Sequence, residues 1–293
     1  MRGEPGCPAC GSSDYRPLFT VQGADYIACH ECGLARMDPM PSDTDLLANF
    51  DAGYFEGAAV PGGYDDYGAD EELHRRNARR RLDRIARHRG ALTPRSLLDI
   101  GCAYGYALDE AREAGWSAVG VEPSPEAAFH ARARGLPVFS DVAAATSAHP
   151  EGFDVVCLCQ VLSHVPDPLA TVTGAVKSLK PGGLLFIETW RRDAWPARVA
   201  GRHWHVIVPP TVVWLETSRS IRSLLDRVGL EVVDWTRGHK TVSAGLVASL
   251  LGTGPFPDAL AGVAQRVGRS RWARAGVRYP FDDLVWVTAE APD

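Results

Sequence analysis

The sequence predicts an α/β fold, in which helices cover both faces of a mostly parallel sheet, with a small metal-bound ribbon ahead of it. Two observations carry this prediction. Residues 97–124 form an apolar strand, a glycine turn, an amphipathic helix and a second strand that ends in a carboxylate. Earlier in the chain, two Cys-x-x-Cys pairs are each followed by glycine. The first pattern is typical of a nucleotide site, and the second is typical of a metal site.

The N-terminal ribbon, residues 1–40, is predicted to hold one metal ion. Four thiolates complete a tetrahedral site with no open position, so the expected ion is structural Zn²⁺. Residues 18–27 alternate as a β-hairpin does. About forty residues bury too little core to fold alone, so metal binding supplies much of the folding free energy. His30 is expected at the surface rather than as a ligand, and the four ligands are Cys7, Cys10, Cys29 and Cys32.

Residues 41–92 are predicted to link the ribbon to the sheet. A short helix is expected within residues 37–50, after two prolines. The segment 53–68 is rich in Gly and Tyr, so it is either a mobile lid over the ligand or an ordinary surface loop. The lid contacts would be Tyr54, Tyr64 and Tyr67.

Residues 71–90 are predicted to form a helix, because their apolar residues recur at intervals of three and four. The same stretch contains eight arginines. That arginine face is either solvated or a docking surface for a phosphorylated substrate or an acidic carrier protein.

The glycine turn after the first strand brings the backbone close to the ligand. Gly101 and Gly105 permit this approach, and Glu122 closes the second strand where a carboxylate accepts ribose hydroxyls. A dinucleotide fingerprint would need glycine at the positions of Ala103 and Tyr106, and the tyrosine obstructs close packing of helix on strand. NAD binding, or no ligand at all, is therefore the weaker alternative.

Asp99, just before this turn, suits a cationic ligand with a free amino group better than it suits a pyrophosphate. The stretch resembles motif I of the class I S-adenosylmethionine (SAM) methyltransferases. Residues 153–168, FDVVCLCQVLSHVPDP, and residues 179–190, LKPGGLLFIETW, resemble later motifs of that family. The four cysteines resemble its subgroup with an N-terminal zinc ribbon, which includes sugar C-methyltransferases and enzymes of secondary metabolism, among them antibiotic biosynthesis.

The resemblance implies a Rossmann-like seven-stranded methyltransferase sheet in residues 93–293. Further strands are expected at residues 136–139, 230–235 and 284–289, with a helix at 218–229. Asp141 and the backbone of Val142 would face the adenine, unless Asp141 only caps a turn. Gln160 would lie near the transferable methyl group. The expected cofactor contacts are Asp99, Gly101, Cys102, Ala103, Gly105, Glu122, Pro123, Asp141, Val142 and Gln160.

An insertion at residues 191–215 is predicted to wall the acceptor pocket. Its tryptophans, Trp195, Trp204 and Trp214, either line that pocket or pack in the core.

Sugar C-methyltransferases carry a base histidine where this chain has Pro-Thr-Val at residues 210–212. His203 and His205 are candidate replacements that share one face if their segment is extended, with a structural role or a metal pair completed by Asp193 and Glu188 as alternatives. His164 is a third candidate base, with a structural role as its alternative.

The predicted function is SAM-dependent, in-line methyl transfer to an oxygen or carbon of a small biosynthetic intermediate, with a histidine removing the acceptor proton. An RNA methyltransferase is one alternative, although the Asn/Asp-Pro-Pro-aromatic signature is missing after the fourth strand. A SAM-binding protein of this fold that does not methylate is another.

Composition limits the partners. The chain has 293 residues and a net charge of -5, which argues against nucleic acid as the partner. No apolar run approaches the length of a membrane span, and no signal sequence follows Met1, so a cytoplasmic protein is expected. We expect a monomer or homodimer that acts on a small-molecule acceptor, which is either free, phosphorylated or carrier-bound.

Overall fold

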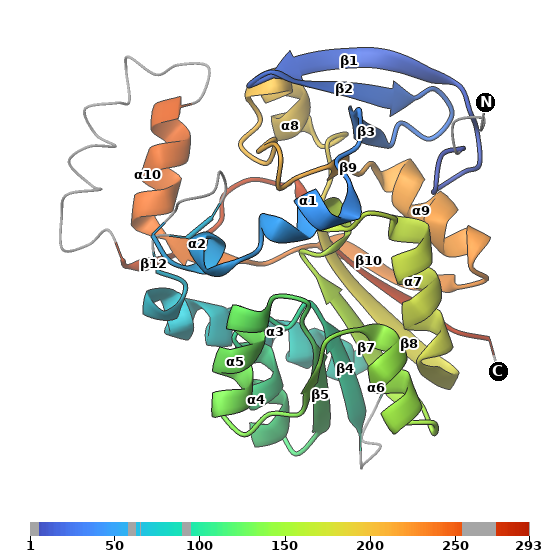
Figure 1. Cartoon of the computed structure of the whole chain (residues 1–293), viewed down its shortest axis with the longest axis vertical. Coiled ribbons are helices and arrows are strands. Elements are labelled where there is room, and N and C mark those ends of the chain that lie inside the picture. Colours follow the sequence, from blue (N-terminus) through green and yellow to red (C-terminus); the bar gives the residue numbers. More distant parts are fainter. Residues whose placement is uncertain (1–5, 58–62, 65, 90–94, 254–273, 293) are drawn as a thin grey trace.

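The computed structural model describes residues 6–57, 63–64, 66–89, 95–253 and 274–292. Its main body is a seven-stranded sheet with helices on both faces, as predicted (Figure 1). The strands lie in the order β10 (Glu231–Arg237), β13 (Leu284–Glu290), β8 (Leu179–Trp190), β7 (Phe153–Cys159), β4 (Ser96–Ile100), β5 (Ser117–Val121) and β6 (Val138–Phe139). Strand β13 is antiparallel to both of its neighbours. The parallel strands β4 to β8 therefore end at one common edge.

Buried strands alternate their side chains between two apolar layers. Leu97 of β4 belongs to one core cluster and Leu98 to the other, as the period of two in a strand requires. The first layer is covered by α3 (Glu71–Arg89), α4 (Tyr106–Glu113) and α5 (Pro125–Ala133). The second is covered by α6 (Val142–Ala148), α7 (Pro168–Lys177) and α9 (Ser218–Arg227).

Local sequence fixes where these helices begin. Ser124 caps α5 ahead of Pro125, and Asp167 caps α7 ahead of Pro168; a proline suits the first helical position because its missing N–H is not needed there. Thr217 and Ser220 form a capping box at the start of α9. These caps set the points at which the chain leaves the ligand-facing edge of the sheet.

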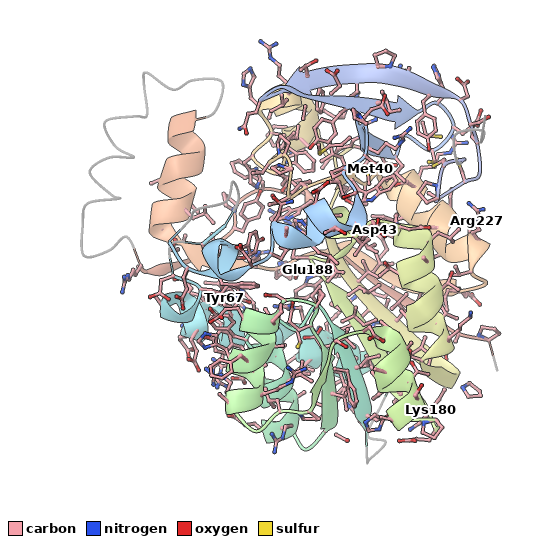
Figure 2. The ribbon with its side chains drawn as sticks, viewed as in Figure 1. Met40, Asp43, Tyr67, Lys180, Glu188 and Arg227 are labelled. Atoms are coloured by element: carbon pink, nitrogen blue, oxygen red, sulfur yellow. The ribbon has the colours of Figure 1, made fainter. Side chains whose placement is uncertain are left out.

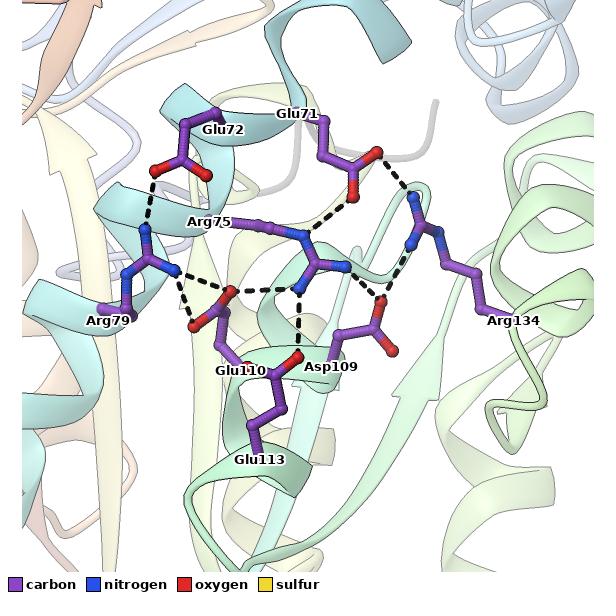
Figure 3. Close-up of polar contacts among 8 residues, drawn as sticks. All are labelled: Glu71, Glu72, Arg75, Arg79, Asp109, Glu110, Glu113 and Arg134. Carbon is purple, nitrogen blue, oxygen red and sulfur yellow. Dashed lines mark hydrogen bonds and ion pairs between the residues drawn. The ribbon is translucent and has the colours of Figure 1, made fainter.

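Helix α3 is fixed to α4 by a network of ion pairs (Figure 3). Arg75 contacts Glu71, Asp109 and Glu110 at 2.8, 2.9 and 3.0 Å. Arg79 reaches Glu110 at 3.1 Å. Elsewhere on α3, Arg84 pairs with Asp234 of β10 at 2.6 Å. These three arginines bind carboxylates of their own chain, so they do not form the docking surface that was the alternative to a solvated face.

The ribbon forms a second sheet together with the predicted insertion. Its strands are β1 (Tyr15–Val21), β2 (Ala24–Cys29) and β3 (Ala35–Asp38), and β3 pairs with β9 (Trp214–Leu215). Tyr26 donates a hydrogen bond to the carbonyl of Val212 at 2.6 Å. In Figure 1 these strands lie above the main sheet, beside α8 (Trp195–Ala200). The ribbon and the insertion thus share one small core.

Shorter elements complete the described chain. They are α1 (Asp43–Ala48), α2 (Ala52–Phe55), η1 (Gly68–Asp70), η2 (Leu162–His164), η3 (Gly201–His203), β11 (Thr241–Ser243), α10 (Ala244–Thr253) and β12 (Gly276–Arg278). No helix among the described residues is long and apolar enough to cross a membrane.

Candidate functional site

The loop between β4 and α4 has the backbone shape that a closely bound ligand requires. Gly101, Ala103 and Gly105 have φ values of 78°, 48° and 80°. A side chain at Gly101 would place its Cβ 2.7 Å from a methyl group of Val161, so only glycine fits there. The two predicted glycines are therefore required by geometry, and Ala103 adopts a left-handed conformation that alanine rarely takes.

Glu122 holds this loop in place. Its carboxylate accepts hydrogen bonds from the backbone amides of Ala103 at 2.8 Å and Ser124 at 2.9 Å. The side chain is buried, which raises its pKa, while the two amides favour the charged form. One carboxylate thus connects the end of β5 to the turn after β4.

A cavity of about 90 Å³ lies between this loop and the ends of β7 and β8. Asp99 lines it and is fully buried, which raises the pKa of its carboxyl to about 7 although Arg81 acts in the opposite direction. Arg81 lines the same cavity. The cavity therefore offers a carboxyl group and a guanidinium group to one ligand.

The far wall of the cavity is polar as well. Glu188 of β8 accepts a hydrogen bond from the Trp286 indole at 2.6 Å, and its other oxygen lies 3.5 Å from the Gln160 amide nitrogen. Gln160 has a positive φ of 61°, and its backbone N–H donates to the Glu188 carbonyl. Cys159 and Lys240 complete this wall.

Aromatic residues of the predicted lid cover the cavity. Tyr64 and Tyr67 both line it, and Tyr67 stacks on His74 with ring centroids 4.1 Å apart. Tyr67 also lies parallel to Tyr106, the residue that replaces the third fingerprint glycine. Tyr67 and Glu188, which both line the cavity, are labelled in Figure 2. Of the lid segment, residues 58–62 and 65 lie outside the described residues.

His74 supplies independent support for a ligand in this cavity. Its Nε2 atom is buried and has no hydrogen-bond partner among the described residues. Burial lowers the pKa of His74 to about 3, so the ring is neutral. A buried polar atom without a partner is costly, and a ligand's polar group would satisfy it.

The remaining predicted cofactor residues lie along the strand edge or beneath it. Asp141 is exposed and accepts the amide of Ala144 at 2.8 Å, which is the capping role that the sequence left open. Pro123 is also exposed, and Val142 begins α6. The Cys102 side chain lines the cavity and also packs against Gly120, where a Cβ would meet its sulfur at 2.5 Å.

The prediction that His203 and His205 share one face is wrong. His203 ends a 3₁₀ turn, not an extended segment, and is exposed. His205 points inward, where its Nε2 lies 3.1 Å from the Tyr279 hydroxyl. That hydroxyl donates to Asp283, so His205 donates to Tyr279. Neither histidine lines the cavity.

His164 is also held by the protein itself. Its Nδ1 lies 2.7 Å from the carbonyl oxygen of Thr211, and burial lowers its pKa. Because the carbonyl can only accept, Nδ1 carries the proton. This bond ties the turn after β7 to the insertion, which is the structural role that the sequence left open.

Of the three tryptophans in the insertion, two are buried and one is exposed. Trp204 and Trp214 are buried and donate to Asp283 at 2.7 Å and to the Val165 carbonyl at 2.8 Å. Trp195 is exposed. Packing, rather than pocket lining, describes the two buried rings.

The sequence did not identify Arg81 or Lys240 as site residues. Arg81 was one of eight arginines on a predicted helix, and Lys240 follows a strand at the far edge of the sheet. A single polar residue leaves no periodic pattern in the sequence. The sequence therefore does not indicate that Arg81 and Lys240 meet at one cavity, and the folded structure shows it.

The four cysteines of the ribbon converge on one point. Their Sγ atoms all lie within 4.8 Å of one another, and among the described residues no other cluster could hold a metal ion. Two pairs, Cys7–Cys32 and Cys10–Cys29, are 3.5 Å apart. Sulfurs at 2.3 Å around a tetrahedral Zn²⁺ would be roughly 3.8 Å apart. The group is therefore consistent with a zinc ribbon, and the histidine metal pair is not formed.

The sheet order, the glycine turn and the buried carboxylates together define a SAM-dependent methyltransferase. Residues 70–234 match the family model described as "Methyltransferase domain". This match spans more than half of the chain, and the protein belongs to that family.

Relatives of known name agree with this class. The chain is 33% identical over 156 residues to a ubiquinone biosynthesis O-methyltransferase of Klebsiella pneumoniae, covering 50% of this chain and 64% of that protein. It is 30% identical over 187 residues to the protein of the same name from Cronobacter sakazakii, covering 60% and 74%. The chain thus spans less than two thirds of the first of these relatives.

Two solved structures share the fold. A complex of the Haloferax volcanii Trm112 methyltransferase activator with a putative methyltransferase contains a chain that matches with a TM-score of 0.51 and 19% identity, covering 77% of this chain and 95% of that one. The YcgJ protein of Bacillus subtilis matches with a TM-score of 0.50 and 13% identity, covering 73% and 99%.

Proposed function

We propose that this protein transfers the methyl group of SAM to a hydroxyl oxygen of a small biosynthetic molecule. The observation that carries the proposal is the cavity between Asp99, Arg81 and the ends of β7 and β8. The choice of oxygen over carbon follows the relatives named as O-methyltransferases. It also fits the absence of a histidine at residues 210–212, where C-methylating relatives carry their base.

The chemistry of the cavity suits the amino-acid end of SAM. Asp99 would hold the ammonium group, Arg81 would bind the carboxylate, and the buried Nε2 of His74 would gain a partner. Glu122 would accept from the ribose while keeping its two bonds to backbone amides. The adenine would follow the strand edge toward Asp141 and Val142.

Bound SAM supplies an electrophilic methyl group on a sulfonium ion that loses its charge in the transfer. The protein's tasks are to align the acceptor with that methyl group, to exclude water and to accept one proton. Tyr64 and Tyr67 line the cavity and pack edge to face, so they would help to exclude water once the cofactor is bound. Gln160 and Glu188, held together at the ends of two neighbouring strands, face the reacting side.

The ribbon would bind one structural Zn²⁺ through its four cysteines. All ligand positions are then filled by sulfur, so the ion takes no part in methyl transfer. Its contribution is to hold β3 in place against β9 of the insertion.

The test is transfer of label from [methyl-³H]SAM to a small-molecule extract or to total RNA. We expect label in the small-molecule fraction, as a base-stable methyl ether, and none with Asp99→Asn. Label in RNA alone would overturn the proposal. Conversion of an extract component without consumption of SAM would instead support the non-methylating alternative.

A further inference from the structure

Lys240 is the one lysine of this protein that lies in the cofactor cavity. The chain contains three lysines. Lys177 is exposed near the end of α7, and Lys180 pairs with Asp154 at 3.1 Å. Lys240 lines the cavity, with its Nζ 5.5 Å from the ring centroid of Trp190.

The ammonium group of Lys240 has no hydrogen bond or ion pair within the described part of the chain. It shares the cavity with Cys159 and Glu188, at the ends of β7 and β8, and both act on its charge. Gln160, expected beside the transferable methyl group, lines the same wall. Lys240 thus lines the same cavity as the residue expected beside the methyl group, and its nitrogen is free to exchange a proton.

Among the described residues, the titratable and charged groups that act on Lys240 or share its cavity come from several elements. They include Arg81 and His74 of α3, Asp99 of β4, Cys159 of β7, Glu188 of β8, Tyr64, His164 and His205. Burial lowers the pKa of Lys240, and Arg81 acts in the same direction, while Glu188 and Cys159 oppose them. The result is a pKa below the ordinary value for lysine, which increases the neutral fraction near pH 7.

We propose that Lys240 is the catalytic base for the acceptor hydroxyl, and this inference rests on the proposed function. Neutral Nζ takes the hydroxyl proton as the acceptor oxygen bonds to the methyl carbon and the carbon–sulfur bond breaks. The products are a methyl ether, S-adenosylhomocysteine and the lysine ammonium ion, which later returns its proton to solvent. A base of this kind suits a weakly acidic hydroxyl, which makes a phenol or enol the expected acceptor class.

The histidines are poorer candidates for this role by position. His205 donates to Tyr279 and does not line the cavity. His164 is fixed on Thr211. His74 lines the cavity, but with a pKa of about 3 it is too weak a base.

The first test is an NMR titration of the protein labelled with ¹³Cε-lysine, with and without S-adenosylhomocysteine. Three lysine signals are expected, and Lys177→Arg, Lys180→Arg and Lys240→Arg assign them. We expect the Lys240 midpoint to lie clearly below that of Lys177. An identical midpoint for these two lysines would overturn the inference, whether or not an acceptor is known.

The second test measures label transfer to the small-molecule extract against pH for the wild type, Lys240→Arg, Lys240→Met and the control Lys177→Arg. Loss of a general base lowers the rate by about 10²- to 10⁴-fold. We expect this loss of rate in both Lys240 variants, and the rising limb of the pH profile should disappear. The affinity for S-adenosylhomocysteine should stay within about threefold of the wild-type value. Arginine keeps a positive charge beside Trp190 but is not a base near neutral pH. A wild-type rate and pH profile in Lys240→Arg would therefore mean that Lys240 has only a structural role.

Two outcomes separate the inference from the proposed function. Weaker S-adenosylhomocysteine binding in Lys240→Met, with an unchanged rate at saturating SAM, would assign Lys240 to the cofactor and overturn the inference alone. No label transfer by the wild type would contradict the proposed function, while the NMR midpoint would still decide whether Lys240 can act as a base.

Discussion

The loop that we propose to hold the cofactor and the insertion that we propose to face the acceptor are built in different ways. The cofactor loop is held by contacts within a single stretch of chain, since Glu122 binds amides of Ala103 and Ser124. The acceptor side is held by contacts between distant segments, such as Thr217 with the Cys32 carbonyl at 2.6 Å and Arg192 with the Gly33 carbonyl at 2.9 Å. A local motif therefore encodes the cofactor loop, whereas the insertion proposed as the acceptor wall is held by the ribbon.

This difference gives the ribbon a structural role in the enzyme. Strand β3 pairs with β9, and Arg227 of α9 donates to the Cys7 carbonyl at 3.1 Å. Both segments follow β8, whose end lies at the reacting side of the cavity. Metal bound in the ribbon would thus determine the shape of the acceptor wall without touching either substrate.

The largest effect is expected from Cys29→Ser. Structural Zn²⁺ contributes roughly 10 kcal/mol or more to small metal-dependent folds, so loss of one ligand should release the ribbon. We expect zinc content to fall below one ion per chain and methyl transfer to drop at least a hundredfold, while S-adenosylhomocysteine still binds.

Elemental analysis, calorimetry and label transfer measure these quantities, and Cys157→Ser is the matched control because Cys157 lies outside the ribbon and does not line the cavity. Equal losses of cofactor binding and methyl transfer in Cys29→Ser would contradict the separation of the two sides.

A large effect confined to the cofactor side is expected from Glu122→Ala. The substitution removes two charge-assisted hydrogen bonds that fix the loop, each worth about 1.5–3 kcal/mol. Calorimetry should show S-adenosylhomocysteine affinity reduced by about 10²-fold or more, with zinc content unchanged. Glu126→Gln is the control, because Glu126 is half exposed and pairs only with His130 in its own helix. Wild-type affinity in Glu122→Ala would remove Glu122 from the site.

The smallest effect is expected from Arg79→Ala in the network of Figure 3. Arg79 and its partner Glu72 are 47% and 65% exposed, so solvent screens their pairing, and buried Glu110 keeps its ion pair with Arg75 at 3.0 Å when Arg79 is removed. We expect unfolding free energy to fall by about 1 kcal/mol or less, with methyl transfer unchanged. A large loss of activity in a thermally stable variant would show that α3 has a further role.

The sequence predicted the cofactor side well because its signals are contiguous. The strand, turn and helix of residues 97–124 appear where expected, and Gly101 and Gly105 have the positive φ that their role requires. The four ribbon cysteines likewise converge as their spacing indicated. Each of these features is fixed by residues close together in the chain.

The acceptor side was harder to predict because its partners are far apart in the sequence. His203 and His205 were expected on an extended segment, but burial of Trp204 against Asp283 turns this segment inward. On the cofactor side too, Arg81 was missed for this reason, since Arg81 and Lys240 reach one cavity only after α3 and β10 pack on the sheet. No local sequence pattern indicates that residues so far apart in the chain line the same cavity.

The most direct test of the cofactor site is calorimetric titration of the wild type with S-adenosylhomocysteine between pH 5.5 and 8.5. The Asp99 carboxyl has a pKa of about 7 without ligand, and a bound ammonium favours its charged form. The account predicts one site per chain, with affinity falling about tenfold per pH unit below pH 7, and weak, nearly pH-independent binding in Asp99→Asn. No binding, or an affinity that is flat with pH and unchanged in Asp99→Asn, would contradict it.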